Sequence, residues 1–87
     1  MNNSIPMIYS VTYLLSVISK NTETMLTRRG NLPFFPIIGM EIDTGEGNPR
    51  KVVDILWRSD ISELAVTFED EEGFSLKIIK SWGWEIL

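Results

Sequence analysis

The sequence contains no cysteine and no histidine. Without cysteine the chain cannot form the disulfides on which small secreted domains usually depend, and this favours the cytoplasm. Without histidine it lacks the commonest general base, the commonest metal ligand and the usual pH-sensitive side chain. We therefore expect a protein that is not an enzyme and that uses no metal ion or cofactor.

Long apolar runs are also scarce. The most apolar stretch, residues 5–19 (IPMIYSVTYLLSVIS), is interrupted by Ser10, Thr12 and Ser16, and it is too short to span a bilayer. No lysine or arginine precedes Lys20, so the stretch lacks the positive region of an export signal. We expect neither a membrane span nor export.

Charge is unevenly distributed along the 87 residues, whose net charge is −4. Residues 1–40 carry three basic side chains and one acidic side chain, whereas residues 41–87 carry five basic and eleven acidic ones. An acidic half disfavours nucleic acid and anionic membranes, since both need basic residues to neutralise phosphate. The expected partner is another protein, a basic one. The length suits a single domain over residues 1–87.

Alternation of apolar and polar residues is the main local pattern, and it predicts strands. ELAVTFE (63–69) and FSLKIIK (74–80) alternate in this way apart from Ile79, and DEEG separates them. Gly73 can take positive φ in a short loop. The sequence therefore predicts a β-hairpin over residues 63–80, with Phe68 and Phe74 pointing inward.

The same period recurs elsewhere. It predicts strands in MEID (40–43), in RKVVDILWR (50–58) and in SWGWEIL (81–87), with TETMLTRR (22–29) pairing back on the first strand. Residues 8–19 fit a strand better than a helix, but their spacing allows both. GNLPFFP (30–36) reads as an extended connector, because residues that precede proline avoid helix.

These elements predict a mainly β fold of five to seven short strands. Two architectures fit: a single small antiparallel sheet, or an open barrel of the SH3 or OB kind. A short N-terminal helix is the alternative for the first element.

Candidate partner-binding residues are acidic or aromatic. Four adjacent carboxylates stand at the tip of the predicted hairpin, two more lie near another strand end, and two indoles share one parity of the last predicted strand: Glu69, Asp70, Glu71, Glu72, Asp43, Glu46, Trp82 and Trp84. Adjacent like charges repel one another, so a basic partner would explain their presence. The two tryptophans can serve either as core or as interface anchors, and core is the favoured interpretation.

Asp43 also begins DTG, the string that carries the catalytic aspartate in aspartic proteases. The 42 residues after Gly45 hold no second glycine-marked loop of the kind that supports such a site. A turn is the simpler interpretation of the string.

The leading hypothesis is a small cytoplasmic inhibitor or immunity protein that neutralises a basic partner, such as a toxin nuclease. A phage-encoded inhibitor of host defence has the same profile. The alternatives are an SH3-like or OB-like adaptor or subunit of a larger assembly, and a small hydrolase built on Asp43.

Overall fold

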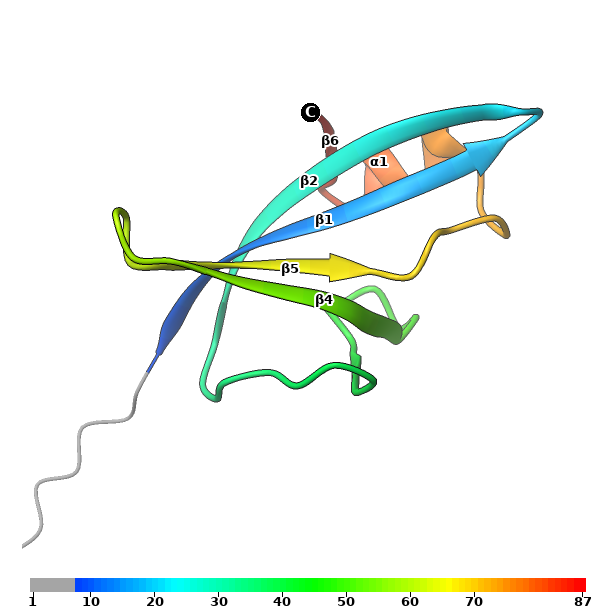
Figure 1. Cartoon of the computed structure of the whole chain (residues 1–87). Coiled ribbons are helices and arrows are strands. Elements are labelled where there is room, and N and C mark those ends of the chain that lie inside the picture. Colours follow the sequence, from blue (N-terminus) through cyan, green and yellow to red (C-terminus); the bar gives the residue numbers. More distant parts are fainter. Residues whose placement is uncertain (1–7) are drawn as a thin grey trace, which may run out of the picture.

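The computed structural model describes residues 8–87, which form a small, mainly β domain (Figure 1). Six strands and one short helix follow one another along the chain: β1 (Tyr9–Ser19), β2 (Thr22–Leu32), β3 (Glu41–Ile42), β4 (Arg50–Arg58), β5 (Glu63–Phe68), α1 (Leu76–Ser81) and β6 (Glu85–Ile86).

The two longest strands, β1 and β2, pair antiparallel along their whole length. Lys20 and Asn21 make the turn between them, with φ of 48° and 65°. A two-residue turn with positive φ at both positions matches the twist of the flanking strands, and asparagine tolerates that conformation well. Residues 9–19 are therefore a strand, which decides between the two interpretations of this segment.

All six strands belong to one open sheet in the order β3-β4-β5-β1-β2-β6. Neighbouring strands are antiparallel except β1 and β5, which run parallel. The expected mainly β fold is confirmed. Of the two expected architectures, the chain adopts the single sheet, and its helix lies near the C-terminus.

One face of the sheet carries the core. Residues 33–49, which include β3, cross this face on the way from β2 to β4, and residues 69–84 bring α1 onto it (Figure 1). The rings of Tyr13 and Phe68 stack at 5.3 Å, and Trp84 packs edge-on to Phe68 at 6.3 Å. The Tyr13 ring occupies the space beside Gly30, where an added Cβ would come within 2.8 Å of it. The buried apolar residues are Val11, Tyr13, Leu15, Val17, Leu26, Leu32, Ile42, Val52, Leu64, Val66, Phe68, Ile79 and Trp84.

A β-bulge changes which residues of β4 face the core. Pairing with β5 shifts between Val52 and Asp54. Val52 lies on the core face before the shift, and Ile55 returns to that face after it, opposite Val66. The regular alternation read from the sequence therefore does not hold across this strand; it had placed four residues on one face: Lys51, Val53, Ile55 and Trp57.

The predicted hairpin over residues 63–80 is wrong in its second half. The first strand of the predicted hairpin forms, as β5 over Glu63–Phe68, but residues 76–81 are helical. The Ser75 hydroxyl accepts the N–H of Ile78 at 3.3 Å and so caps the helix. Ile79, which broke the alternation, is buried in the core. Phe74, predicted to point inward, is 40% exposed.

The two C-terminal tryptophans do not share a strand face, as the sequence had predicted. Trp82 caps the C-terminus of α1, and Gly83, with φ of 94°, redirects the chain before the short β6. Trp84 is buried in the core, which was the favoured interpretation. Trp82 is half-buried, with its ring 5.1 Å from that of Phe74.

Candidate functional site

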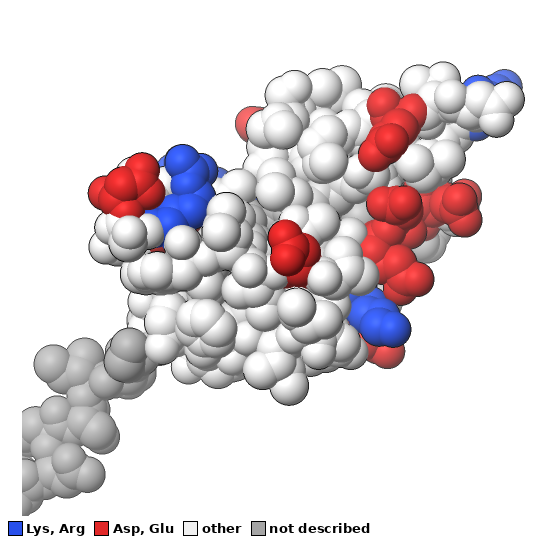
Figure 2. All heavy atoms as spheres, in the orientation of Figure 1, with Lys and Arg blue, Asp and Glu red and all other residues white. Residues whose placement is uncertain are grey.

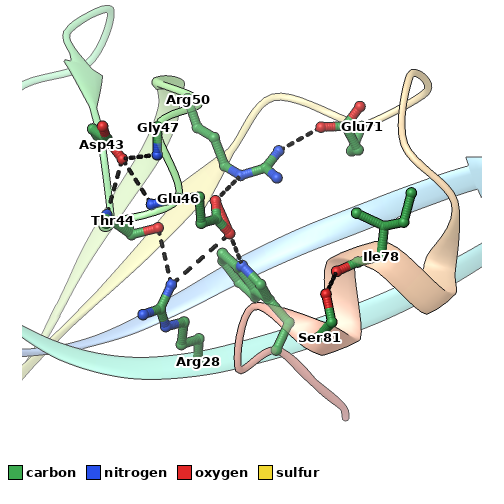
Figure 3. A network of polar contacts seen from close by, with 11 residues as sticks. Arg28, Asp43, Thr44, Glu46, Gly47, Arg50, Glu71, Ile78 and Ser81 are labelled. Carbon is green, nitrogen blue, oxygen red and sulfur yellow. Dashed lines mark hydrogen bonds and ion pairs between the residues drawn. The ribbon is translucent and has the colours of Figure 1, made fainter.

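A buried arginine organises the polar interior of the domain. Arg50, the first residue of β4, is only 5% exposed. Its Nε donates to Glu46 at 3.2 Å, and its Nη1 donates to Glu71 at 2.7 Å (Figure 3). Its guanidinium carbon also lies 5.9 Å from the centre of the Trp84 ring. A buried guanidinium needs such partners, because desolvation penalises an unpaired charge heavily.

Glu46 extends this network across the core face. Its carboxylate accepts the indole N–H of Trp84 and lies 3.9 Å from Nη1 of Arg28 on β2 (Figure 3). Arg28 also donates to the Thr44 hydroxyl at 3.2 Å. Residues 43–47 are therefore tied to β2, which lies on the far side of the open sheet from β3, so polar side chains join the two ends of the sheet.

Asp43 holds the loop that carries Glu46. Its Oδ1 accepts the N–H groups of Gly45, Glu46 and Gly47 at 2.9, 3.0 and 3.1 Å. Gly45 and Gly47 both have positive φ, which favours glycine at these positions. The DTG string thus forms a turn whose carboxylate is occupied by backbone donors.

Glu71 fixes the segment that follows β5. Its Oε2 accepts the N–H groups of Gly73 and Phe74, while Oε1 binds Arg50. Its own N–H donates to the carbonyl of Ser16 at 2.8 Å, and its carbonyl accepts from Ile18 at 2.9 Å. This residue therefore anchors the segment to β1 through its backbone and to the interior through its side chain.

The pKa of Glu71 reflects these contacts. Burial by itself would raise the pKa, but the hydrogen bond from Arg50, the two backbone N–H donors and the positive charge of Arg50 outweigh it. The net result is a pKa below the usual value of 4.5, so the carboxylate is charged at neutral pH.

Three carboxylates beside Glu71 remain on the surface. Glu69, Asp70 and Glu72 are exposed, and together they form what we call the acidic segment. Acidic side chains gather on one side of the molecule in Figure 2, beyond the end of β5 in Figure 1. The fixed position of Glu71 between them holds the backbone from which they project.

The predicted site residues thus separate into two groups. Glu46, Glu71 and Trp84 take part in the interior network, and Asp43 holds a loop. Glu69, Asp70 and Glu72 are exposed, and Trp82 is half-buried beside Phe74. The four adjacent carboxylates of the sequence therefore do not form one exposed group, because Glu71 turns inward.

Sequence reasoning missed two features. The first is Arg50, whose role as the centre of the network depends on residues 4 and 21 positions away. The second is the outer edge of β4 over residues 53–58, which we call the β4 edge. Three large apolar side chains in it are exposed: Val53 at 43%, Leu56 at 57% and Trp57 at 46%. An apolar strand predicted from sequence is normally assumed to be buried, so no pattern marked this edge.

Comparisons of the chain with protein-family models, with curated proteins and with solved structures found no match. Within residues 8–87, no three carboxylates lie close enough together to hold a metal ion. The helix in that part of the chain, α1, has six residues and is too short to span a bilayer.

Proposed function

We propose that this protein is a small protein-binding domain that holds a basic partner through the acidic segment, Glu69, Asp70 and Glu72. The observation that carries the proposal is the double anchoring of Glu71, which fixes the backbone from which the three exposed carboxylates project. A fixed backbone lowers the entropy lost on binding, and complementary charge raises the association rate.

The charges around the acidic segment support this choice. Arg50 is buried and already paired with Glu46 and Glu71, so it does not neutralise the exposed carboxylates. Lys51 lies on the adjacent strand, beside Glu69 and Asp70. The three surface carboxylates carry more charge than Lys51 can offset, and a cationic surface would match the excess.

The specific form that we propose is an inhibitor of the immunity kind, acting on a basic enzyme such as a nuclease. Carboxylates spaced along a fixed backbone can occupy the cationic groove that otherwise binds substrate phosphates. A phage-encoded inhibitor of a host defence nuclease would use the same chemistry.

The test titrates a synthetic (Lys-Arg)₄ peptide into labelled protein and follows backbone amide shifts by NMR. We expect the largest shifts at residues 69–74. Replacing Glu69, Asp70 and Glu72 by Gln, Asn and Gln should weaken binding about tenfold or more, because three charge contacts are lost. A matched control, Asp60→Asn with Glu85→Lys, changes the net charge by the same three units at exposed residues elsewhere.

The control should change binding less than about twofold, since distant exposed charges are screened at 0.15 M salt. Shifts spread evenly over the surface, or equal loss of binding in the triple variant and the control, would contradict the proposal. Such results would mean that the peptide senses net charge alone.

A second candidate function is a subunit of an assembly, and the β4 edge favours it. An exposed strand edge offers backbone hydrogen bonds to another chain, and exposed Trp57 and Leu56 add apolar area.

A further inference from the structure

On the side away from β5, β4 pairs with β3 over a short part of its length. β3 pairs with β4 only at Arg50 and Lys51, and the two backbone bonds of Val52 reach Gly39 and Met40. Among residues 8–87, no strand pairs with residues 53–58 on that side. Alternate N–H and C=O groups along this length therefore face away from the sheet.

The β4 edge is only partly protected against pairing. Natural edges are shielded by proline, charged side chains or bulges, and they are often very short. Residues 53–58 read VDILWR, without proline or glycine; the bulge lies at the start of the segment, and the charged residues are Asp54 and Arg58, which are opposite in sign. An apolar edge of this length is a template for pairing with another strand.

The residues of this edge are complementary to themselves. Asp54, Leu56 and Arg58 lie on the outer face of the sheet, which is the face opposite the core. They pair there with the β5 residues that alternate with the buried ones. Two strands that pair in a continuous sheet place residues of the same face opposite one another. An antiparallel pair centred on Leu56 therefore puts Asp54 of each copy opposite Arg58 of the other.

We propose that two copies of this chain associate through antiparallel pairing of their β4 edges, centred on Leu56. The pairing is isologous, as a twofold axis requires, and it joins the two six-stranded sheets into one. It forms two Asp54–Arg58 ion pairs and one Leu56–Leu56 contact on the outer face. On the core face it brings Ile55 against the half-exposed Trp57 of the second copy.

Charge selects this register over its neighbours. A shift by two residues in one direction would set Asp54 opposite Leu56, and a shift in the other would set Arg58 opposite Leu56. Both shifts lose the two opposite-charge pairs, which stabilise cross-strand contacts. An unrelated extended segment would gain the backbone bonds without the reciprocal ion pairs, so a second copy is the occupant that the residues favour.

The test is sedimentation velocity from about 1 μM to 1 mM, because an interface of one strand per copy is small and its affinity correspondingly modest. We expect concentration-dependent dimerisation. Asp54→Arg sets two arginines opposite each other at both ends of the pair and should weaken the dimer about tenfold or more. The double variant Asp54→Arg with Arg58→Asp exchanges the charges and should regain most of that loss.

Glu85→Arg is the matched control, since it makes the same charge change on β6 at the opposite end of the sheet. It should leave the dimer within about twofold of the wild type. Urea unfolding of each variant verifies that the monomer fold is intact. As a second readout, hydrogen exchange at Ile55 and Trp57 should slow as protein concentration rises.

Three outcomes would overturn the inference. The first is a monomer at every concentration up to 1 mM. The second is a dimer that Asp54→Arg leaves unchanged, which places the contact elsewhere. The third is a dimer lost in Asp54→Arg and not regained in the charge exchange, which rules out the Leu56-centred register. None of them bears on the acidic segment, which lies on other residues.

Discussion

Four adjacent residues, Glu71 and the three carboxylates beside it, share the same chemistry but lie in different environments. Glu69, Asp70 and Glu72 face solvent, whereas Glu71 binds Arg50 and two backbone N–H groups. Its backbone bonds to β1 set the direction of its side chain, so the neighbours that flank it are directed outward. Of the four carboxylates, Glu71 thus stabilises the fold, and the other three are available for binding.

The lowered pKa of Glu71 predicts an acid-sensitive contribution to stability. Above about 4.5, the usual pKa, the carboxylate is charged in both the folded and the unfolded chain and the contribution is complete. As pH falls below that value the unfolded chain takes up a proton first, so the contribution is lost as pH falls through the lowered pKa.

Glu71→Gln should therefore lower the free energy of unfolding by about 1–2 kcal/mol at pH 7 and by less near pH 3. Urea unfolding at a series of pH values measures both differences. Glu72→Gln is the control, because Glu72 is exposed and its substitution should have an effect near zero at every pH. A Glu71→Gln difference that stays constant with pH would contradict the assignment of the charged contact.

At the scale of elements, the path of residues 69–81 determines which acidic side chains lie on the surface. A hairpin would have placed all four carboxylates at an exposed tip, but the chain instead runs beside β1 and then enters α1. Leu76 and Ile79, three positions apart, pack on the core from one face of this helix. The helix is only six residues long, so its stability depends on packing and on its cap.

Ser75→Ala should lower the free energy of unfolding by about 1 kcal/mol, because the Ile78 N–H loses its acceptor. Ser75→Asp keeps an oxygen at the cap and should retain wild-type stability. Urea unfolding followed by circular dichroism gives both values. Equal stability of all three proteins, or equal loss in both variants, would mean that Ser75 does not cap α1.

For the whole molecule, the open sheet depends on two crossing segments to cover its single core face. Arg50 holds both of them, since Glu46 belongs to the first and Glu71 to the second. Trp84 donates its indole N–H to Glu46 and packs on Phe68. The C-terminal end of the chain is thereby attached to the same network. This small domain, with one thin core, therefore uses a buried network of ion pairs to hold the two crossing segments over that core.

Arg50→Met should lower the free energy of unfolding by about 3–5 kcal/mol, because Glu46 and Glu71 lose their main cation inside the protein. Arg29→Met, at an exposed position on β2, should change it by less than about 0.5 kcal/mol. The denaturant midpoint of each variant measures the difference. Adding Glu46→Gln and Glu71→Gln to Arg50→Met should recover part of the loss, and no recovery would show that Arg50 acts through packing alone.

How much of the fold could be predicted depends on the distance between the residues involved. Alternation along β1, β2 and β5 was sufficient to predict those strands, because burial of one sheet face imposes a period of two on neighbouring residues. The helix at residues 76–81 was missed because a segment of six residues can fit both the strand period of two and the helix period of about 3.6. Which of the two forms depends on the contact of Ile79 with the core. The bulge in β4 was missed for the same reason, since it is set by pairing with β5.

The sequence by itself determined that the protein is a small, mainly β domain without cysteine or histidine, and that its C-terminal half is strongly acidic. Only the tertiary structure decided which acids are exposed, that the side chains of Arg50 and Glu46 are buried together, and that residues 53–58 of β4 have an edge without a partner strand among residues 8–87. Composition and periodicity act along the chain, whereas ion pairs and sheet edges depend on contacts between residues far apart in it. The acidic segment and the β4 edge are therefore properties of the fold.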